Sequence, residues 1–236
     1  MTLIGLHGGG NMVEAIFRQA EGREDIQVAA IISRSPVPWS GDTPQYPSLE
    51  NLAADIDVLI DFTLPDGLQS AARWCAKNRT PLLSGTTGLD EQQQGCLPEA
   101  ARSVAVLHSA NLSLGMGLLQ RLVEEAARVL GDTADITIED VHHIHKKDAP
   151  SGTALMLGGA IAEFCPHGDI TYNSKREGEV IGRHVVRFSL ADEQIELSHT
   201  AENRSIYATG ALHAALWLAN QKPGFYTNID YLDSNR

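Results

Sequence analysis

Residues 2–20 read TLIGLHGGGNMVEAIFRQA, and this stretch decides the fold class. An apolar run at residues 3–6 predicts a strand, a glycine cluster follows, and residues 12–20 have helical periodicity. Glycines at such a turn let the backbone approach a pyrophosphate, which the amides and the positive dipole end of the next helix can bind. We therefore predict a dinucleotide-binding turn, although glycines also form flexible turns without a ligand.

The alternation of strand and helix continues through the first half of the chain. Apolar runs of strand length lie at residues 27–33, 57–63, 81–87 and 104–110, and helical patterns at 67–77 and 90–102. Alternating units of this kind imply a parallel sheet with helices on its faces. The predicted fold class is α/β, with an N-terminal doubly wound, Rossmann-like parallel sheet.

The pattern changes near residue 113, where we expect a smaller α+β domain to begin. A long amphipathic helix is predicted at residues 114–130, a strand at 135–145 and a helix at 151–164. Residues 183–190 and 194–199 read as an antiparallel pair of strands. One more helix, at residues 210–220, precedes a polar tail.

Composition excludes several classes of partner. Acidic residues outnumber basic ones 30 to 18, and the net charge is −12, so the surface would repel a nucleic acid or an anionic membrane. No apolar run approaches the roughly 18 residues of a membrane span, and the start does not resemble a signal peptide. Cys75, Cys96 and Cys165 are widely spaced, which predicts reduced thiols in a cytoplasmic protein.

The end of the second predicted strand bears on the choice of cofactor. NAD-binding folds usually place a carboxylate there to accept hydrogen bonds from the ribose hydroxyls, whereas this chain has Ser33 and Arg34. An arginine can pair with a 2′-phosphate instead. The sequence therefore favours NADPH over NADH, with an ordinary solvated arginine as the alternative.

Small polar residues end the next three predicted strands, at residues 61–63, 84–88 and 108–111. Ligands bind at the carboxyl edge of an open α/β sheet. Small residues at that edge would let a nicotinamide ring lie against the backbone. The alternative is that glycine and threonine only form turns there.

The segment HHIHKKDAPSGT at residues 142–153 concentrates three of the nine histidines beside two lysines. Pro150 and the residues after it predict a helix start with available amides, which beside cations forms a receptor for a carboxylate. Histidine adds a proton donor.

A basic surface loop is one alternative interpretation of this segment. A metal site on His143 and His145, taken to share a strand face, is another, but the lysines would repel a dication. A nucleophilic Ser151 lacks the usual Gly-x-Ser-x-Gly setting.

At these residues the sequence resembles the 4-hydroxy-tetrahydrodipicolinate reductase family, long called dihydrodipicolinate reductases, of the diaminopimelate route to lysine. The main likeness is residues 139–154, EDVHHIHKKDAPSGTA. Further likeness lies at residues 61–63, 85–88, 109–113, 203–204 and 210–212. The resemblance covers most of the chain in the expected order.

The resemblance implies an NAD(P)H-dependent reductase of a small cyclic dicarboxylate. It implies a dinucleotide-binding domain at residues 1–112 with 205–236, and a substrate-binding and oligomerisation domain at 113–204. His142 would be the proton donor and Lys146 a second donor, with His143, Ser151, Gly152 and Thr153 holding the substrate carboxylates. The implied cofactor contacts are His7, Gly8, Gly9, Gly10, Asn11, Met12, Arg34, Gly85, Thr86, Thr87, Ser109, Ala110, Asn111 and Leu112.

The chain departs from the family pattern at three places. His7 and Val13 stand where the glycine loop usually carries its first and last glycines. The segment around residues 175–182 is shorter than in familiar members, in which it helps to build the sheet of the tetramer. The resemblance therefore implies a homo-oligomer, a tetramer by analogy or a dimer because of the shorter segment.

The sequence is also compatible with two other functions. One is a catalytically silent NADPH-binding sensor, whose His-Lys segment would contact a partner. The intact run at residues 142–153 favours the reductase, because a sensor needs no proton donor beside an anion receptor. The other is a metal-dependent hydrolase, which would require a bound metal.

Overall fold

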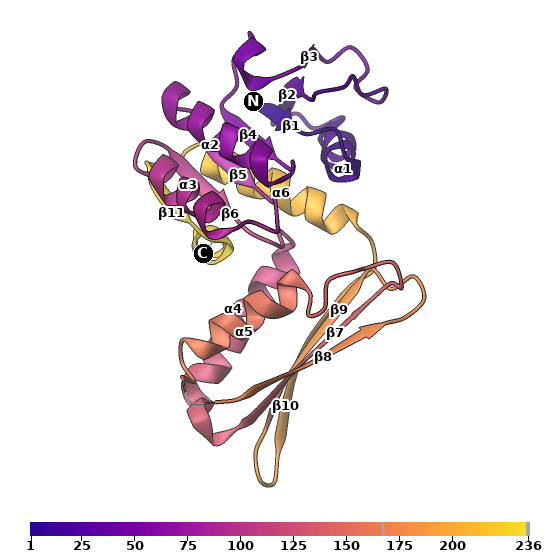
Figure 1. Ribbon diagram of the computed structural model, residues 1–236, viewed down its shortest axis with the longest axis vertical. Coiled ribbons are helices and arrows are strands. Elements are labelled where there is room, and N and C mark those ends of the chain that lie inside the picture. Colours follow the sequence, from indigo (N-terminus) through magenta and orange to yellow (C-terminus); the bar gives the residue numbers. More distant parts are fainter. Residues whose placement is uncertain (167, 235–236) are drawn as a thin grey trace. The chain divides into compact units, whose positions relative to one another are not determined.

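The computed structural model describes residues 1–166 and 168–234. The chain forms two compact units (Figure 1). Unit 1 is Met1–Ser113 together with the segment that begins at Ser205, and unit 2 is Leu114–Arg204. In the described part of the chain, no helix is both long enough and apolar enough to cross a membrane.

Unit 1 contains a seven-stranded sheet in the order β11-β6-β5-β4-β1-β2-β3, and all of its pairings are parallel. This confirms the predicted α/β class and the doubly wound sheet. Its strands are β1 (Thr2–His7), β2 (Ile26–Ile32), β3 (Gln45–Tyr46), β4 (Val58–Asp61), β5 (Leu82–Ser84), β6 (Ala105–His108) and β11 (Gly224–Tyr226).

Helices cover both faces of this sheet. On one face, α1 (Asn11–Ala20) and α6 (Ser205–Leu218) pack on strand residues such as Leu6 and Ile60. On the other face, α2 (Pro65–Asn78) and α3 (Glu91–Ala101) pack on residues such as Leu59 and Val106. Because both faces are buried, the central strands β1, β4, β5 and β6 are mostly apolar, and their polar residues gather at the carboxyl ends.

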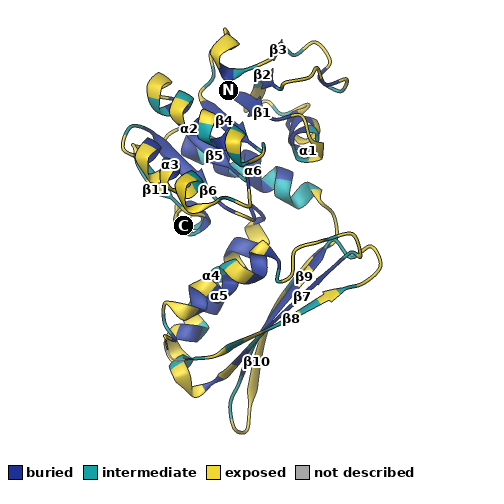
Figure 2. Ribbon diagram, viewed as in Figure 1, coloured by how far each residue is buried: buried dark blue, intermediate teal, exposed yellow. Residues whose placement is uncertain are grey.

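Unit 2 is a four-stranded mixed sheet in the order β10-β9-β7-β8, with one face covered by two helices. β7 pairs parallel with β8 and antiparallel with β9, and β9 pairs antiparallel with β10. The central strands are mostly buried and the edge strands are more exposed (Figure 2). The elements are α4 (Leu114–Leu130), β7 (Asp135–His142), α5 (Gly152–Ala162), β8 (Ile170–Arg176), β9 (Gly182–Ser189) and β10 (Gln194–Ala201).

Three sequence expectations differ from the structure. The strand predicted at residues 135–145 ends at His142, because the chain then turns and the Lys146 N–H donates to the His143 carbonyl. β8 was missed, since its polar residues belong to a half-exposed edge strand. The polar tail contains two elements that were not predicted: β11 adds to the sheet beside β6, and a capping box formed by Thr227 and Asp230 starts α7 (Asn228–Asp233).

Candidate functional site

The glycine turn of unit 1 has the geometry of an anion-binding site. Gly8 has φ +125°, a conformation that suits glycine, and a Cβ there would lie 2.8 Å from the Phe62 carbonyl oxygen. Gly10 occupies the N-cap of α1. Because glycine has no side chain, no side-chain hydrogen bond caps the start of this helix. The first-turn amides, which begin at Asn11 and Met12, therefore face outward for an anionic group.

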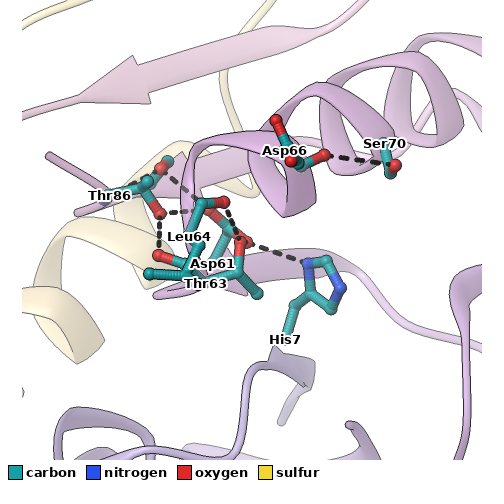
Figure 3. A network of polar contacts seen from close by, with 8 residues as sticks. His7, Asp61, Thr63, Leu64, Asp66, Ser70 and Thr86 are labelled. Atoms are coloured by element: carbon teal, nitrogen blue, oxygen red, sulfur yellow. Dashed lines mark hydrogen bonds and ion pairs between the residues drawn. The ribbon is translucent and has the colours of Figure 1, made fainter. Parts of the chain in front are cut away.

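A buried carboxylate, Asp61, joins the carboxyl ends of β1, β4 and β5 (Figure 3). Its oxygens lie 2.8 Å from His7 Nδ1 and accept hydrogen bonds from the side chains of Thr63, Ser84 and Thr86 at 2.8, 3.0 and 2.8 Å. Because an ionised carboxylate only accepts, His7 Nδ1 carries the hydrogen of that contact. The His7 side chain thus fills the place of a glycine and is held on the sheet edge.

The ends of β5 and β6 form the next part of the same edge. A Cβ at Gly85 would lie 2.2 Å from the Phe62 ring, so this position has no room for a side chain. His108 Nε2 lies 2.8 Å from the Thr86 carbonyl oxygen, and Asn228 of α7 donates to the Asn111 carbonyl oxygen at 2.6 Å. The polar tail at the end of the chain therefore fixes the loop after β6.

The structure places every predicted cofactor residue in unit 1: His7 is the last residue of β1, and the others follow β1, β2, β5 or β6. Arg34, Thr87 and Ala110 are exposed, whereas Ser109, Asn111 and Leu112 are buried. The glycine turn, the open amides and the side-chain-free surface at Gly85 fit a dinucleotide. Sequence reasoning did not foresee that Asp61 would tie His7 to the other strands.

The His-Lys segment of unit 2 begins on β7 and ends at the start of α5. Asp140 and His142 point to the same face of the sheet, since side chains alternate along a strand. Asp140 is buried and accepts hydrogen bonds from the Ser151 N–H at 3.2 Å and from Arg176 at 3.3 Å. His142 Nδ1 lies 3.4 Å from the same carboxylate oxygen. This carboxylate therefore connects the proposed proton donor to the helix start.

The amino end of α5 presents the predicted carboxylate receptor. Ser151 is its N-cap, and the Ser151 hydroxyl oxygen accepts from the Ala154 N–H at 3.2 Å. Gly152 and Thr153 begin the first turn, where backbone amides and the helix dipole favour an anion. Lys146 Nζ lies 2.9 Å from Asp148 Oδ1 and is partly exposed, so the ammonium group is accessible to a ligand.

Two buried histidines of this unit have strongly lowered pKa values. Burial, followed by the charge of Lys146, lowers the pKa of His142 from 6.5 to about 4. Burial, followed by the proximity of His142, lowers the pKa of His184 on β9 to about 3. Both rings are therefore neutral at neutral pH without a ligand. His184 was missed from sequence, where it is one polar residue inside a predicted strand.

These pKa values predict that acid destabilises the protein. Between pH 6.5 and about 3 the unfolded chain binds protons at His142 and His184 that the folded chain does not bind. The free energy of unfolding therefore decreases as the pH is lowered through this range. Urea unfolding measured across this range tests the prediction. His184→Phe should flatten the slope by up to about 1.4 kcal/mol per pH unit, the value for one proton. An unchanged slope would contradict the buried, neutral state of His184.

The hypothesis of a metal site assumed that His143 and His145 share one face of a strand, and the structure does not have this arrangement. β7 ends at His142, so His143 and His145 lie in the turn and do not share a strand face. Their ring centroids are 6.1 Å apart. Within residues 1–166 and 168–234, no three His, Cys, Asp or Glu side chains are grouped to hold a metal ion.

Comparisons with known proteins agree over nearly the whole chain. Two family models match in order: dihydrodipicolinate reductase, N-terminus, at residues 2–112, and dihydrodipicolinate reductase, C-terminus, at residues 115–232. The 4-hydroxy-tetrahydrodipicolinate reductase of Zymomonas mobilis is 41% identical over 97% of this chain and 96% of its own length. That of Xanthomonas euvesicatoria is 42% identical over 94% and 93%, respectively.

Solved structures share the fold. A dipicolinate-bound dihydrodipicolinate reductase from Paenisporosarcina sp. TG-14 has a TM-score of 0.82 at 23% identity, covering 96% of this chain and 98% of its own. A diaminopimelate (DAP) dehydrogenase of C. glutamicum, in complex with DAP, has a TM-score of 0.61 at 13% identity, with coverages of 97% and 93%. At these identities the likeness concerns the fold alone.

Proposed function

This chain belongs to the dihydrodipicolinate reductase family, and we propose that unit 1 binds its nicotinamide cofactor and unit 2 its dicarboxylate substrate. The observation that carries the proposal is the ordered match of both family models over nearly the whole chain. The protein is a pyridine-nucleotide-dependent oxidoreductase that reduces 4-hydroxy-tetrahydrodipicolinate to tetrahydrodipicolinate in lysine biosynthesis through diaminopimelate. The sensor alternative draws no support from these relatives, which are named as reductases.

The cofactor residues act by binding and orientation. The first-turn amides of α1 and the glycine turn bind the pyrophosphate, and the loops after β5 and β6 hold the nicotinamide end at the sheet edge. The bound nicotinamide supplies a hydride. The Asp61 network fixes the strand ends that carry these loops, so the contacts are formed before the cofactor arrives.

The substrate residues supply charge and a proton. The Ser151 hydroxyl and the amides at Gly152 and Thr153, with His143, hold the two carboxylates, and Lys146 adds a positive charge. The Ser151 N–H itself donates to Asp140. Once the hydroxylated substrate has lost water and the conjugated ring has accepted a hydride, His142 would donate the proton where negative charge develops. His142 is neutral in the free protein, so the two substrate carboxylates must raise its pKa on binding.

NADPH is the proposed preferred cofactor, with NADH as a slower alternative. Arg34 is exposed directly after β2, where a cation can reach a 2′-phosphate, and Ser33 leaves no carboxylate to repel that phosphate. We expect Arg34→Ala to weaken NADPH binding about tenfold and to leave NADH binding unchanged. Titration of cofactor fluorescence measures both constants. An equal loss for the two cofactors, or no loss, would contradict the assignment.

The proposal also covers assembly and location. We expect a homo-oligomer. The family resemblance favours a tetramer, whereas the short connection between β8 and β9 favours a dimer. The three cysteines are free thiols in the structure, which supports a reducing, cytoplasmic location. Sedimentation at micromolar concentration would give the stoichiometry.

A coupled assay tests the activity. The unstable substrate is formed in place from pyruvate and aspartate semialdehyde by the preceding enzyme of the route, and nicotinamide absorbance is followed with NADPH or NADH. Rapid oxidation that depends on the protein supports the reductase, and the ratio of the two rates tests the cofactor preference. A protein that binds either cofactor but oxidises neither would instead support the sensor.

A further inference from the structure

The mechanism above makes no use of His184, although this residue is buried beside the proposed proton donor. It lies on β9 with 2% of its surface exposed, and in the sheet register it is directly opposite Asp140 of β7. Its neighbours Val186 and Phe188 face the helices, so the His184 ring faces the start of α5 as well.

Two contacts join His184 to the substrate residues. Its Nε2 lies 3.3 Å from the Ser151 hydroxyl oxygen. Its ring meets the His142 ring edge-on, with centroids 5.1 Å apart and an interplanar angle of 73°. A single side chain therefore touches both the proposed proton donor and the N-cap of the carboxylate receptor.

The surroundings of His184 also determine which of its two ring nitrogens carries the hydrogen. Four ionisable groups face the ring: Asp140 and His142 from β7, His199 from β10 and Lys146 from the loop after β7. With a pKa of about 3 the imidazole is neutral and carries one hydrogen. Nδ1 is buried without a hydrogen-bonding partner in the described residues. Because an unpaired N–H costs more than an unpaired lone pair, the hydrogen belongs on Nε2.

This tautomer determines what Ser151 can do. Nε2–H donates to the Ser151 oxygen, which also accepts from the Ala154 N–H at 3.2 Å. Both lone pairs of the hydroxyl oxygen are then used. The Ser151 hydrogen therefore points away from these two donors. Because Ser151 is 1% exposed, only a ligand seated directly on the helix start can accept this hydrogen.

We propose that His184 is a positioning residue: it donates to Ser151, so that the Ser151 hydroxyl donates to a substrate carboxylate, and it holds the His142 ring against its edge. The inference rests on the proposed function, in which the start of α5 binds a dicarboxylate. It adds a residue that touches neither substrate nor cofactor and acts through two residues that do.

A double-mutant cycle with dipicolinate as the probe tests this role. Calorimetry gives its dissociation constant for the wild type, His184→Phe, Ser151→Ala and the double variant. We expect each single variant to bind about tenfold more weakly, the loss of one hydrogen bond to a charged group. The double variant should bind no more weakly than Ser151→Ala alone. Additive losses, or wild-type binding by His184→Phe, would overturn the inference.

Two further variants separate positioning from folding. His184→Gln keeps an N–H donor and should recover most of the affinity, which a purely structural role would not predict. Val185→Ala removes buried surface from the same strand, on its other face, and should leave dipicolinate binding unchanged. If Val185→Ala matched His184→Phe in dipicolinate affinity, the effect would come from packing and the inference would fail.

The proposed function fails in a different way. A wild-type protein that neither bound dipicolinate nor reduced the substrate would overturn the proposed function, and this inference with it. A wild type that does both, with Ser151→Ala impaired and His184→Phe unimpaired, would overturn the inference and leave the reductase in place.

Discussion

Replacement of His142 by glutamine is expected to lower kcat by about 10² to 10⁴, the usual contribution of a general acid. Glutamine keeps polarity and similar bulk but cannot transfer a proton at neutral pH. The buried position of His142 beside Asp140 and His184 should persist, because neither neighbour depends on a charged imidazole there. Steady-state rates from the coupled assay, with cofactor and dipicolinate affinities from calorimetry, measure the effect.

The same segment offers matched controls for this prediction. His145 and Lys147 are exposed in the turn, whereas His142 is buried and Lys146 is half-buried. His145→Gln and Lys147→Gln should keep wild-type rates, and Lys146→Gln should lose both rate and affinity for the dicarboxylate. Full activity of His142→Gln, or equal losses in all four variants, would show that the proton donor has been assigned wrongly.

Gly10→Ala is expected to weaken cofactor binding by about tenfold to 10²-fold, and to lower stability by no more than about 1 kcal/mol because alanine is a poorer N-cap than glycine. A Cβ at Gly10 meets no atom within 4 Å in the protein, and the residue has φ −89°, which alanine adopts readily. The added methyl group would instead occupy the space through which a pyrophosphate approaches the amides of α1. Fluorescence titration with NADPH and thermal unfolding measure the two effects.

Gly95 provides the comparison for Gly10. It is exposed inside α3, and a Cβ there also meets no atom within 4 Å. Gly95→Ala should stabilise the protein by about 0.5–1 kcal/mol through helix propensity and leave cofactor binding unchanged. Should Gly10→Ala behave in the same way as Gly95→Ala, the cofactor does not approach this turn.

The fold of unit 1 was predictable because its signals are local. Most strands of its parallel sheet are largely apolar runs, and polar residues or glycines lie at the sheet edge, such as Gly8 after β1 and Asp61 at the end of β4. The helix at residues 114–130 was predicted with its observed bounds, since Gly131 ends it with φ +54°. β8 and β11 were missed because their strand character comes from pairing with β7 and β6, which no local pattern reveals.

The candidate site was predictable only in part. The segment from His142 to Thr153 is dense in one stretch of sequence, so its residues could be named and the turn between β7 and α5 anticipated. Asp140 and His184 could not be identified as partners of these residues from the sequence. Their contacts with the site depend on burial and on the pairing of β7 with β9. Asp61 was visible as a strand end, but its bond to His7 depends on two strands meeting in space.

Transfer of a labelled hydride tests the account most directly. The coupled reaction would be run with NADPH that carries deuterium on the transferred position of its nicotinamide ring, and the tetrahydrodipicolinate product would be analysed by mass spectrometry. The account predicts that each product molecule gains one deuterium atom, and that the wild-type protein is required for this. Oxidation of the cofactor with no deuterium in the product would contradict it, because the hydride would then have gone to another acceptor.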